Sequence, residues 1–185
     1  MTKFTTHTLE SAPAAARPLL EAAKSKLGFI PNLYGNLAEA PAALQAYFDL
    51  SAHFDKTSFT PVERQVVLLA ISTENNCEFC VAAHSVIARQ MVKVPSPVVD
   101  ALRAFTPLPD AHLDALATFA RAVVRERGFV ASAALDAFLA SGFTRRQVIE
   151  VVLGVSMKTL SNYVNHLTGT VTNSEFATET WKRAA

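Results

Sequence analysis

The sequence predicts an all-α fold, formed by a single helical domain over residues 1–185. Hydrophobic residues recur at helical spacing through most of the chain. Capping-box patterns begin at Thr60 and Thr144, each just before such a stretch. No convincing alternation of polar and apolar residues with hairpin turns is found. Half of the residues are hydrophobic and 18% are charged, a composition typical of a globular chain with a substantial core.

Capping residues, breakers and apolar spacing define the expected helices in order. In the first half they cover residues 11–28, short pieces between 28 and 42, and then 44–54, 61–73 and 77–91. The helix at 61–73 is apolar nearly all round, which predicts a central position. In the second half, helices are expected from residue 96, over 109–128, 132–140, 145–155 and 160–169, and at 174–181.

An internal repeat is indicated by two matching segments. Arg64-Gln65-Val66 stands 20 residues before His84, and Arg146-Gln147-Val148 stands 20 residues before His166. The match predicts a two-helix unit that is used twice and packs about a pseudo-twofold axis. The second copy keeps the histidine and lacks both cysteines, so only the first copy has thiol chemistry.

Charge and hydropathy exclude several classes of partner. The formal net charge is +1 and no run of lysines or arginines is present, so we expect no nucleic-acid partner. The N-terminus lacks the apolar region of a signal peptide, and the longest apolar run, Val66 to Ile71, is far too short to span a bilayer. We therefore expect a cytoplasmic protein that does not bind a membrane.

The candidate site lies in the segment from Glu74 to His84, which contains the only two cysteines. Cys77 and Cys80 are three residues apart, and His84 follows four residues later. In a helix, these three positions share one face. Asn75 or Asn76 is expected to cap a helix that starts near Cys77, and the field of a helix N-terminus favours a thiolate.

This cluster is open to three interpretations. The cysteines could be small buried residues beside a core histidine. They could form a Cys2His metal site, although a closed zinc site needs a fourth ligand. The favoured interpretation is a redox-active dithiol without a cofactor, because Cys-x-x-Cys pairs in a reducing compartment are seldom structural. In that case His84 assists Cys80, and Cys77 attacks the sulfenic acid formed on Cys80.

The motif also carries a family resemblance. Arg64-Gln65, an apolar helix and Cys77-x-x-Cys80-x-x-x-His84 resemble the AhpD-like alkylhydroperoxidases of the carboxymuconolactone decarboxylase superfamily. Residues 28–32 are similar to the start of its peroxidase-related branch, and the resemblance extends from about residue 28 to 169. It implies an all-α fold with a duplicated helical unit and a trimer or hexamer. It also implies a hydroperoxide substrate, an external dithiol reductant, Cys80 as the peroxidatic cysteine, Cys77 as the resolving cysteine and His84 in the proton relay.

Two departures from the family pattern bear on the relay. The better-known AhpD enzymes have a glutamate twelve residues before the first cysteine, where this chain has Gln65, and a histidine where it has Phe79. Glu74 is the expected replacement carboxylate. Decarboxylase members of the superfamily lack the dithiol, so decarboxylation is not expected. A redox-sensing or interaction protein, whose dithiol switches an oligomer without efficient turnover, is the alternative from a different functional class.

Overall fold

The structure is a computed structural model that describes residues 4–183, and within this range it contains helices and no strand, which confirms the all-α prediction. A π-helical turn, η1, continues α5, and a 3-10 helix, η2, lies near the C-terminus. The elements are α1 Arg17–Leu27, α2 Asn32–Leu37, α3 Pro41–Phe54, α4 Pro61–Glu74, α5 Glu78–Val86, η1 Ile87–Val92, α6 Ser96–Ala104, α7 Ala111–Arg125, α8 Ser132–Ala140, α9 Arg145–Thr168 and η2 Ser174–Glu179.

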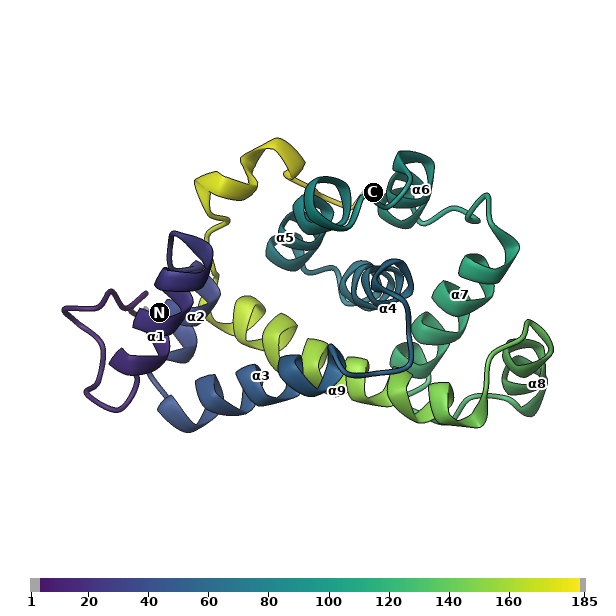
Figure 1. The fold of residues 1–185 in the computed structure, drawn as a ribbon, viewed down its shortest axis with the longest axis horizontal. Helices are drawn as coiled ribbons and strands as arrows, with labels where there is room; N and C mark the ends of the chain where they lie inside the picture. Colours follow the sequence, from purple (N-terminus) through teal and green to yellow (C-terminus); the bar gives the residue numbers. More distant parts are fainter. Residues whose placement is uncertain (1–3, 184–185) are drawn as a thin grey trace.

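Helix α4 is the centre of the fold, as its apolar sequence predicts. It packs against α5, α6, α7 and α9, and Figure 1 shows it end-on in the middle of the molecule. Every residue from Val66 to Thr73 is buried. The predicted capping box is present, because Thr60 accepts a hydrogen bond from the Glu63 amide and the Glu63 carboxylate accepts one from the Thr60 amide. The segment that leads to the cysteines is thus held in the core.

Helix α9 differs from the prediction in its length. It is one continuous helix of 24 residues, where two helices at 145–155 and 160–169 were expected. The expected break falls near Gly154, but this glycine remains helical because its bare Cα lets the helix lie against Phe54 and Val67. The segment that matches α4 and α5 in sequence is therefore not a second two-helix unit. His166 is exposed on it, whereas His84 is buried.

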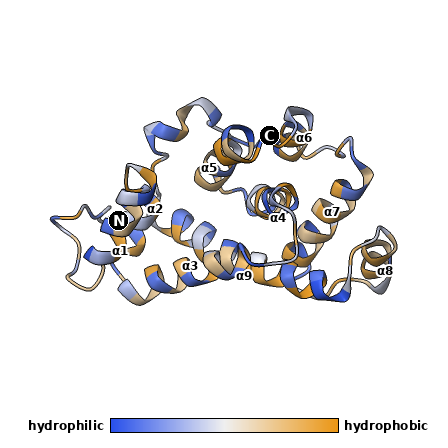
Figure 2. Cartoon of the chain, in the orientation of Figure 1, coloured by the Kyte–Doolittle hydropathy of each residue, from blue (hydrophilic) through white to orange (hydrophobic). Residues whose placement is uncertain are grey.

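Hydrophobic and hydrophilic residues are mixed along the long helices, as Figure 2 shows for α7 and α9. Between residues 4 and 183, no helix combines the length and the apolar character needed to cross a membrane. The long helices instead bury one side and expose the other.

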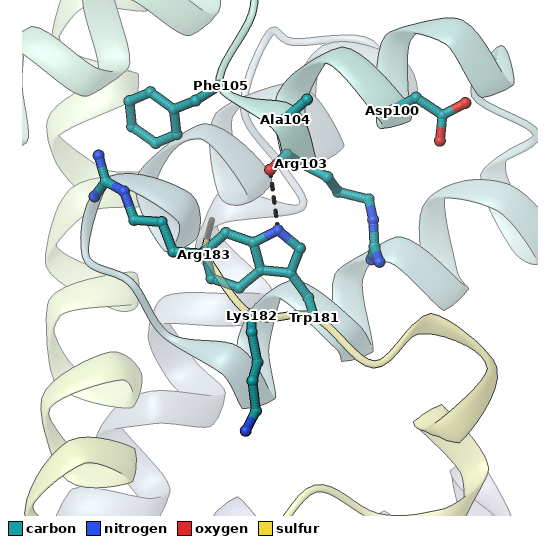
Figure 3. A pocket seen from close by; sticks show the side chains of 7 residues that line it. All are labelled: Asp100, Arg103, Ala104, Phe105, Trp181, Lys182 and Arg183. Atoms are coloured by element: carbon teal, nitrogen blue, oxygen red, sulfur yellow. Dashed lines mark hydrogen bonds between the residues drawn. The ribbon is translucent and has the colours of Figure 1, made fainter. Parts of the chain in front are cut away.

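The C-terminal segment crosses over α5 and ends beside α6 (Figure 1). The Trp181 indole donates a 3.0 Å hydrogen bond to the backbone carbonyl of Arg103 (Figure 3). In return, the Arg103 guanidinium donates to the carbonyls of Glu179 and Thr180, each at 3.1 Å. The expected helix at 174–181 is a 3-10 helix over Ser174–Glu179. These contacts fix the segment that covers one side of the cysteine helix.

Candidate functional site

The turn between α4 and α5 places the two cysteines. Cys77 is the N-cap of α5 and Cys80 lies in its first turn, and both are buried, with 1% and 2% of their surface exposed. The predicted cap at Asn75 or Asn76 is wrong. Asn75 is the C-cap of α4, and Asn76 has a φ of 55°, a left-handed conformation that asparagine tolerates. The chain reverses through these residues, so the helix begins one step later than expected.

One face of α9 meets the dithiol. Lys158, Ser161 and Asn165 stand at positions i, i+3 and i+7 of this helix, and all three are buried. The Asn165 amide donates to the sulfur atoms of both cysteines, at 3.5 Å to Cys77 and 3.3 Å to Cys80. Ser161 Oγ lies 3.9 Å from Cys80 Sγ. A single side chain from α9 therefore holds the two sulfur atoms together.

The two thiols are electrostatically different. Burial opposes ionisation of Cys80, but the hydrogen bond from Cys77, the charge of Lys158 and hydrogen bonds with Lys158 and Ser161 outweigh it and lower its pKa. Cys77 donates its hydrogen to Cys80, and this bond, together with burial, raises the pKa of Cys77 well above the usual range. At neutral pH, Cys80 is therefore the thiolate and Cys77 the thiol.

His84 lies between two polar side chains. Its Nδ1 is 3.1 Å from Gln65 Oε1, and its Nε2 is 3.2 Å from Lys158 Nζ. An ammonium group only donates, so Nε2 must accept, and the ring hydrogen sits on Nδ1 and is donated to Gln65. Burial and the charge of Lys158 hold the pKa of His84 well below its usual range, so the ring is neutral. His84 is therefore hydrogen-bonded to Gln65 and Lys158. The charged partner of Cys80 is Lys158 and not His84.

Glu74 is not brought to the dithiol. Its carboxylate lies 3.8 Å from the guanidinium of Arg125 on α7, and it is absent from the wall of the cavity that reaches Cys80. Nine residues of α-helix make two and a half turns, so Glu74 and Gln65 leave α4 on opposite sides. The prediction that Glu74 replaces the relay glutamate is therefore corrected: Gln65 occupies that place beside His84.

A cavity of about 630 Å³ gives access to the site. Cys80, His84, Lys158 and Gln65 lie on its wall, and Cys77 does not. Most of the remaining wall is apolar, with contributions from Phe29, Pro31, Leu33, Phe54, Leu68, Phe79, Met91, Val92, Met157 and Phe176. Cys80 is thus the thiol that a molecule in this cavity meets first.

The C-terminal segment closes one side of the cavity. Phe176 of η2 packs edge-to-face on Phe29 and on Phe79, with ring centroids 5.6 and 5.7 Å apart. Tyr34 and Tyr47 also line the cavity. Burial, followed by the charge of Cys80, raises the pKa of Tyr34 to about 12, and burial also raises that of Tyr47. Both phenols therefore keep their hydrogens and are hydrogen-bond donors on the cavity wall.

The alternative of a Cys2His metal site has little support. Among residues 4–183, no group of three or more His, Cys, Asp or Glu side chains is arranged to hold a metal ion. Both ring nitrogens of His84 are engaged by protein groups, and one of these groups is the Lys158 ammonium. A positive charge in that position repels a cation.

A second hollow, of about 330 Å³, lies between α6 and the C-terminal segment (Figure 3). Its wall includes Phe105, and the guanidinium groups of Arg121 and Arg183 lie 4.1 and 4.5 Å from the centre of that ring. The hollow is lined by no cysteine or histidine. The contacts around this hollow hold the C-terminal segment in place, and the hollow has no part in thiol chemistry.

Cys77, Cys80 and His84 can be predicted from the sequence motif, whereas Lys158, Ser161 and Asn165 of α9 lie outside it. The available signal was the spacing of three polar residues at 158, 161 and 165, which places them on one face of a helix. The division of 145–169 into two helices concealed it, because it separated Lys158 from the other two.

Comparisons with known proteins agree with this fold. The model of the carboxymuconolactone decarboxylase family matches residues 38–108, a segment that contains the dithiol. No curated protein sequence matches the chain. An uncharacterized peroxidase-related protein with an alkylhydroperoxidase AhpD core, from Ralstonia eutropha JMP134, has 26% identity and a TM-score of 0.83 over 94% of this chain and 93% of that one.

Two further solved structures share the fold at lower identity. A peroxidase-related protein from Silicibacter sp. TM1040 has 22% identity and a TM-score of 0.77, with 95% of each chain covered. The debrominase Bmp8 has 18% identity and a TM-score of 0.79, with 97% of this chain and 96% of that one covered. The chain is thus similar to the carboxymuconolactone decarboxylase family over the dithiol segment, and it shares its fold with a protein that has an AhpD core over nearly its whole length.

Proposed function

We propose that this protein is a thiol-dependent peroxidase that reduces alkyl hydroperoxides through a dithiol–disulfide cycle. The observation that carries the proposal is the position of Cys80, a thiol of lowered pKa on the wall of an apolar cavity, with Cys77 held beside it by Asn165. The Cys80 thiolate at the cavity wall is the nucleophile. The Cys77 thiol, just behind the wall, attacks the sulfenic acid that forms on Cys80.

The cycle has three chemical steps. The Cys80 thiolate attacks the terminal oxygen of the hydroperoxide, so that an S–O bond forms, the O–O bond breaks and the alkoxide leaves as an alcohol after it takes a proton. Cys77 then attacks the sulfur of the Cys80 sulfenic acid, which forms the disulfide and releases water. An external dithiol reduces the disulfide and returns both cysteines to their starting forms. Because each cycle needs this reduction, we place the reaction in the cytoplasm.

The cavity favours an organic substrate. Its wall is mainly aliphatic and aromatic, which suits the alkyl part of a hydroperoxide better than it suits hydrogen peroxide. Tyr34 and Tyr47 add two O–H donors within the same space, and these are suited to the oxygen atoms of the substrate.

Dimedone labelling, which traps sulfenic acids, tests the proposal. After treatment with one equivalent of an alkyl hydroperoxide, the Cys77→Ser variant should carry the label on Cys80, and the Cys80→Ser variant should carry none. Peptide mass spectrometry reports both outcomes. Label on Cys77 in the Cys80→Ser variant, with none on Cys80 in the other, would reverse the roles, and no label in either would exclude peroxide chemistry at this dithiol.

Steady-state turnover separates the enzyme from the alternative of a redox sensor. An enzyme consumes many equivalents of hydroperoxide when an external dithiol is supplied, whereas a sensor oxidises once and is slowly reset. We expect turnover, because the apolar cavity is a substrate-sized space that a simple switch does not need. We also propose that the protein is a homo-oligomer, for which the exposed side of α9 is the expected contact.

A further inference from the structure

The deepest charged group in the protein is the ammonium of Lys158. Its side chain is completely buried, with 0% of its surface exposed, and it reaches from α9 to the wall of the cavity that Cys80 also lines. A buried charge is costly unless it is paired and hydrogen-bonded. Its neighbours here are the neutral His84, at 3.2 Å, and the Cys80 sulfur, which is the only one of the two that takes a negative charge.

His84 is poorly suited to supply a proton to the reaction. Its one hydrogen sits on Nδ1 and points to Gln65, and its other nitrogen faces the Lys158 ammonium. To protonate a leaving oxygen, the ring would have to turn and break both bonds. Lys158, in contrast, lies on the cavity wall with three hydrogens, of which His84 accepts one.

From this geometry we propose that Lys158 is a catalytic residue that pairs with the Cys80 thiolate and donates the proton that the leaving oxygen requires. The inference rests on the proposed function and assigns a proton donor to it. His84 is then a positioning residue that orients the ammonium, with Gln65 fixing its ring.

The proton balance follows from this assignment. As the Cys80 thiolate takes the terminal oxygen of the hydroperoxide, the departing alkoxide receives a proton from the Lys158 ammonium and leaves as the alcohol. Cys77 then attacks the sulfenic acid, and its thiol hydrogen leaves with the hydroxyl group as water. The site now holds a disulfide and a neutral amine. Reduction by an external dithiol supplies two electrons and two hydrogens, of which one stays on Cys77 and the other returns to Lys158 as Cys80 becomes a thiolate again.

The first test measures the ionisation of Cys80 in the absence of peroxide. Iodoacetamide alkylation of Cys80 in the reduced protein is followed against pH by peptide mass spectrometry. Lys158→Met should move the midpoint upward by more than one pH unit, so that alkylation at low pH slows by about tenfold or more. Lys24→Met, which removes an exposed lysine of α1, is the matched control and should leave the midpoint in place. A Lys158→Met midpoint no higher than that of the control would overturn the pairing.

The second test isolates proton donation by comparing leaving groups. Single-turnover rates are measured at a pH at which Cys80 is ionised in both proteins, with an alkyl hydroperoxide and with a peroxy acid. An alkoxide needs a proton as it leaves, whereas a carboxylate does not, and a general acid is typically worth about 10²–10⁴-fold. Lys158→Met should therefore slow the first reaction by at least about 100-fold and leave the second nearly unchanged. Equal slowing of both reactions would overturn the donor role.

Lys158→Arg keeps the charge and provides a variant that does not depend on tolerance of an apolar side chain. A guanidinium does not lose its proton in proteins, so this variant should keep a low alkylation midpoint and still react slowly with the alkyl hydroperoxide. A rate equal to that of the unmodified protein would overturn proton donation. The unmodified protein and all variants could fail to react with hydroperoxide while the alkylation midpoint of Cys80 still depends on Lys158. In that case the proposed function is wrong, but the pairing of Lys158 with the Cys80 thiolate is retained.

Discussion

Gln65 Oε1 and His84 Nδ1 lie 3.1 Å apart, and this contact orients an imidazole ring that burial and the charge of Lys158 keep neutral. The amide oxygen accepts the ring hydrogen but brings no negative charge, so nothing on that side stabilises an imidazolium. On the other side of the ring, the Lys158 ammonium opposes a second positive charge. Gln65 therefore holds the ring by a hydrogen bond without adding a negative charge to the site.

Substitution of Gln65 by glutamate should restore a charged histidine. A carboxylate about 3 Å from Nδ1 favours the imidazolium and typically shifts a partner's pKa by about 1–3 units. We expect the pKa of His84 to rise in Gln65→Glu, as followed by NMR of the ring protons against pH. Glu74→Gln is the control, since Glu74 pairs with Arg125 on the far side of α4. A ring that titrates as in the unmodified protein would show that the charge at position 65 does not control His84.

Acidification should destabilise the protein through the same histidine. In the unfolded chain His84 binds a proton below about pH 6.5, whereas in the folded protein its pKa lies well below that value. Below pH 6.5 the unfolded state therefore holds more protons, and the free energy of unfolding falls as the pH falls, by up to about 1.4 kcal/mol per pH unit. Cys80 acts in the same direction, so the effect of His84 is measured in a Cys80→Ser background.

Urea unfolding at pH 7.5 and 5.5 gives the required comparison, at pH values on either side of about 6.5. His84→Gln should reduce the loss of stability between the two pH values. His166→Gln, which changes the exposed histidine of α9, should retain the full loss. If both variants lose the same stability as their common background, the pH dependence has another source.

Gly154 should not tolerate a methyl group, although alanine normally stabilises a helix by about 1 kcal/mol relative to glycine. A Cβ atom at this position would lie 2.9 Å from Phe54 Cε2 and 3.0 Å from Val67 Cγ1, both in buried side chains. Overpacking of this kind costs about 1–3 kcal/mol, so we expect Gly154→Ala to lower the free energy of unfolding in urea. Ser156→Ala, at an exposed position of the same helix, should be nearly neutral. A more stable Gly154→Ala protein would show that α9 and α3 move apart without cost.

Local signals in the sequence predicted much of the fold. The capping boxes at Thr60 and Thr144 and the C-cap at Gly28 gave helix ends within one or two residues, because each depends only on neighbouring residues. The continuity of α9 depends instead on contacts of Gly154 with Phe54 and Val67, which no local pattern reveals.

The candidate site could be predicted only in part, because local patterns reveal residues that are close in sequence but not contacts between distant segments. Cys77, Cys80 and His84 stand close together in sequence, so helical spacing alone indicated that they cooperate. Lys158 and Asn165 come from a segment more than 70 residues away, and they reach His84 and the sulfur atoms, respectively, only through the packing of α9 on α5. Glu74 is close to the cysteines in sequence but not in space, because it leaves α4 half a turn away from Gln65 and the cavity and lies near Arg125 instead.

The remaining prediction concerns the side of α9 that faces away from the dithiol. Ile149, Val152, Tyr163 and Leu167 are 68%, 44%, 53% and 78% exposed, and their spacing of 3, 11 and 4 residues puts them in one stripe. Lys158, Ser161 and Asn165 occupy the opposite face of the same helix. A stripe of four large apolar side chains along a helix about 36 Å long is self-complementary when two copies pack antiparallel about a twofold axis.

We therefore expect a second copy of this chain to cover the α9 stripe. A hexamer built from two trimers contains such twofold axes and a trimer does not, which favours the hexamer of the two sizes implied by the family resemblance. Light scattering should give a mass several times the 20.0 kDa of the chain, and Leu167→Glu should reduce it, because a buried carboxylate at the contact lacks a partner. Phe129→Glu, which changes an 89% exposed side chain between α7 and α8, should leave the mass unchanged. A monomer at micromolar concentration, or equal dissociation in both variants, would show that the α9 stripe is not the contact between copies.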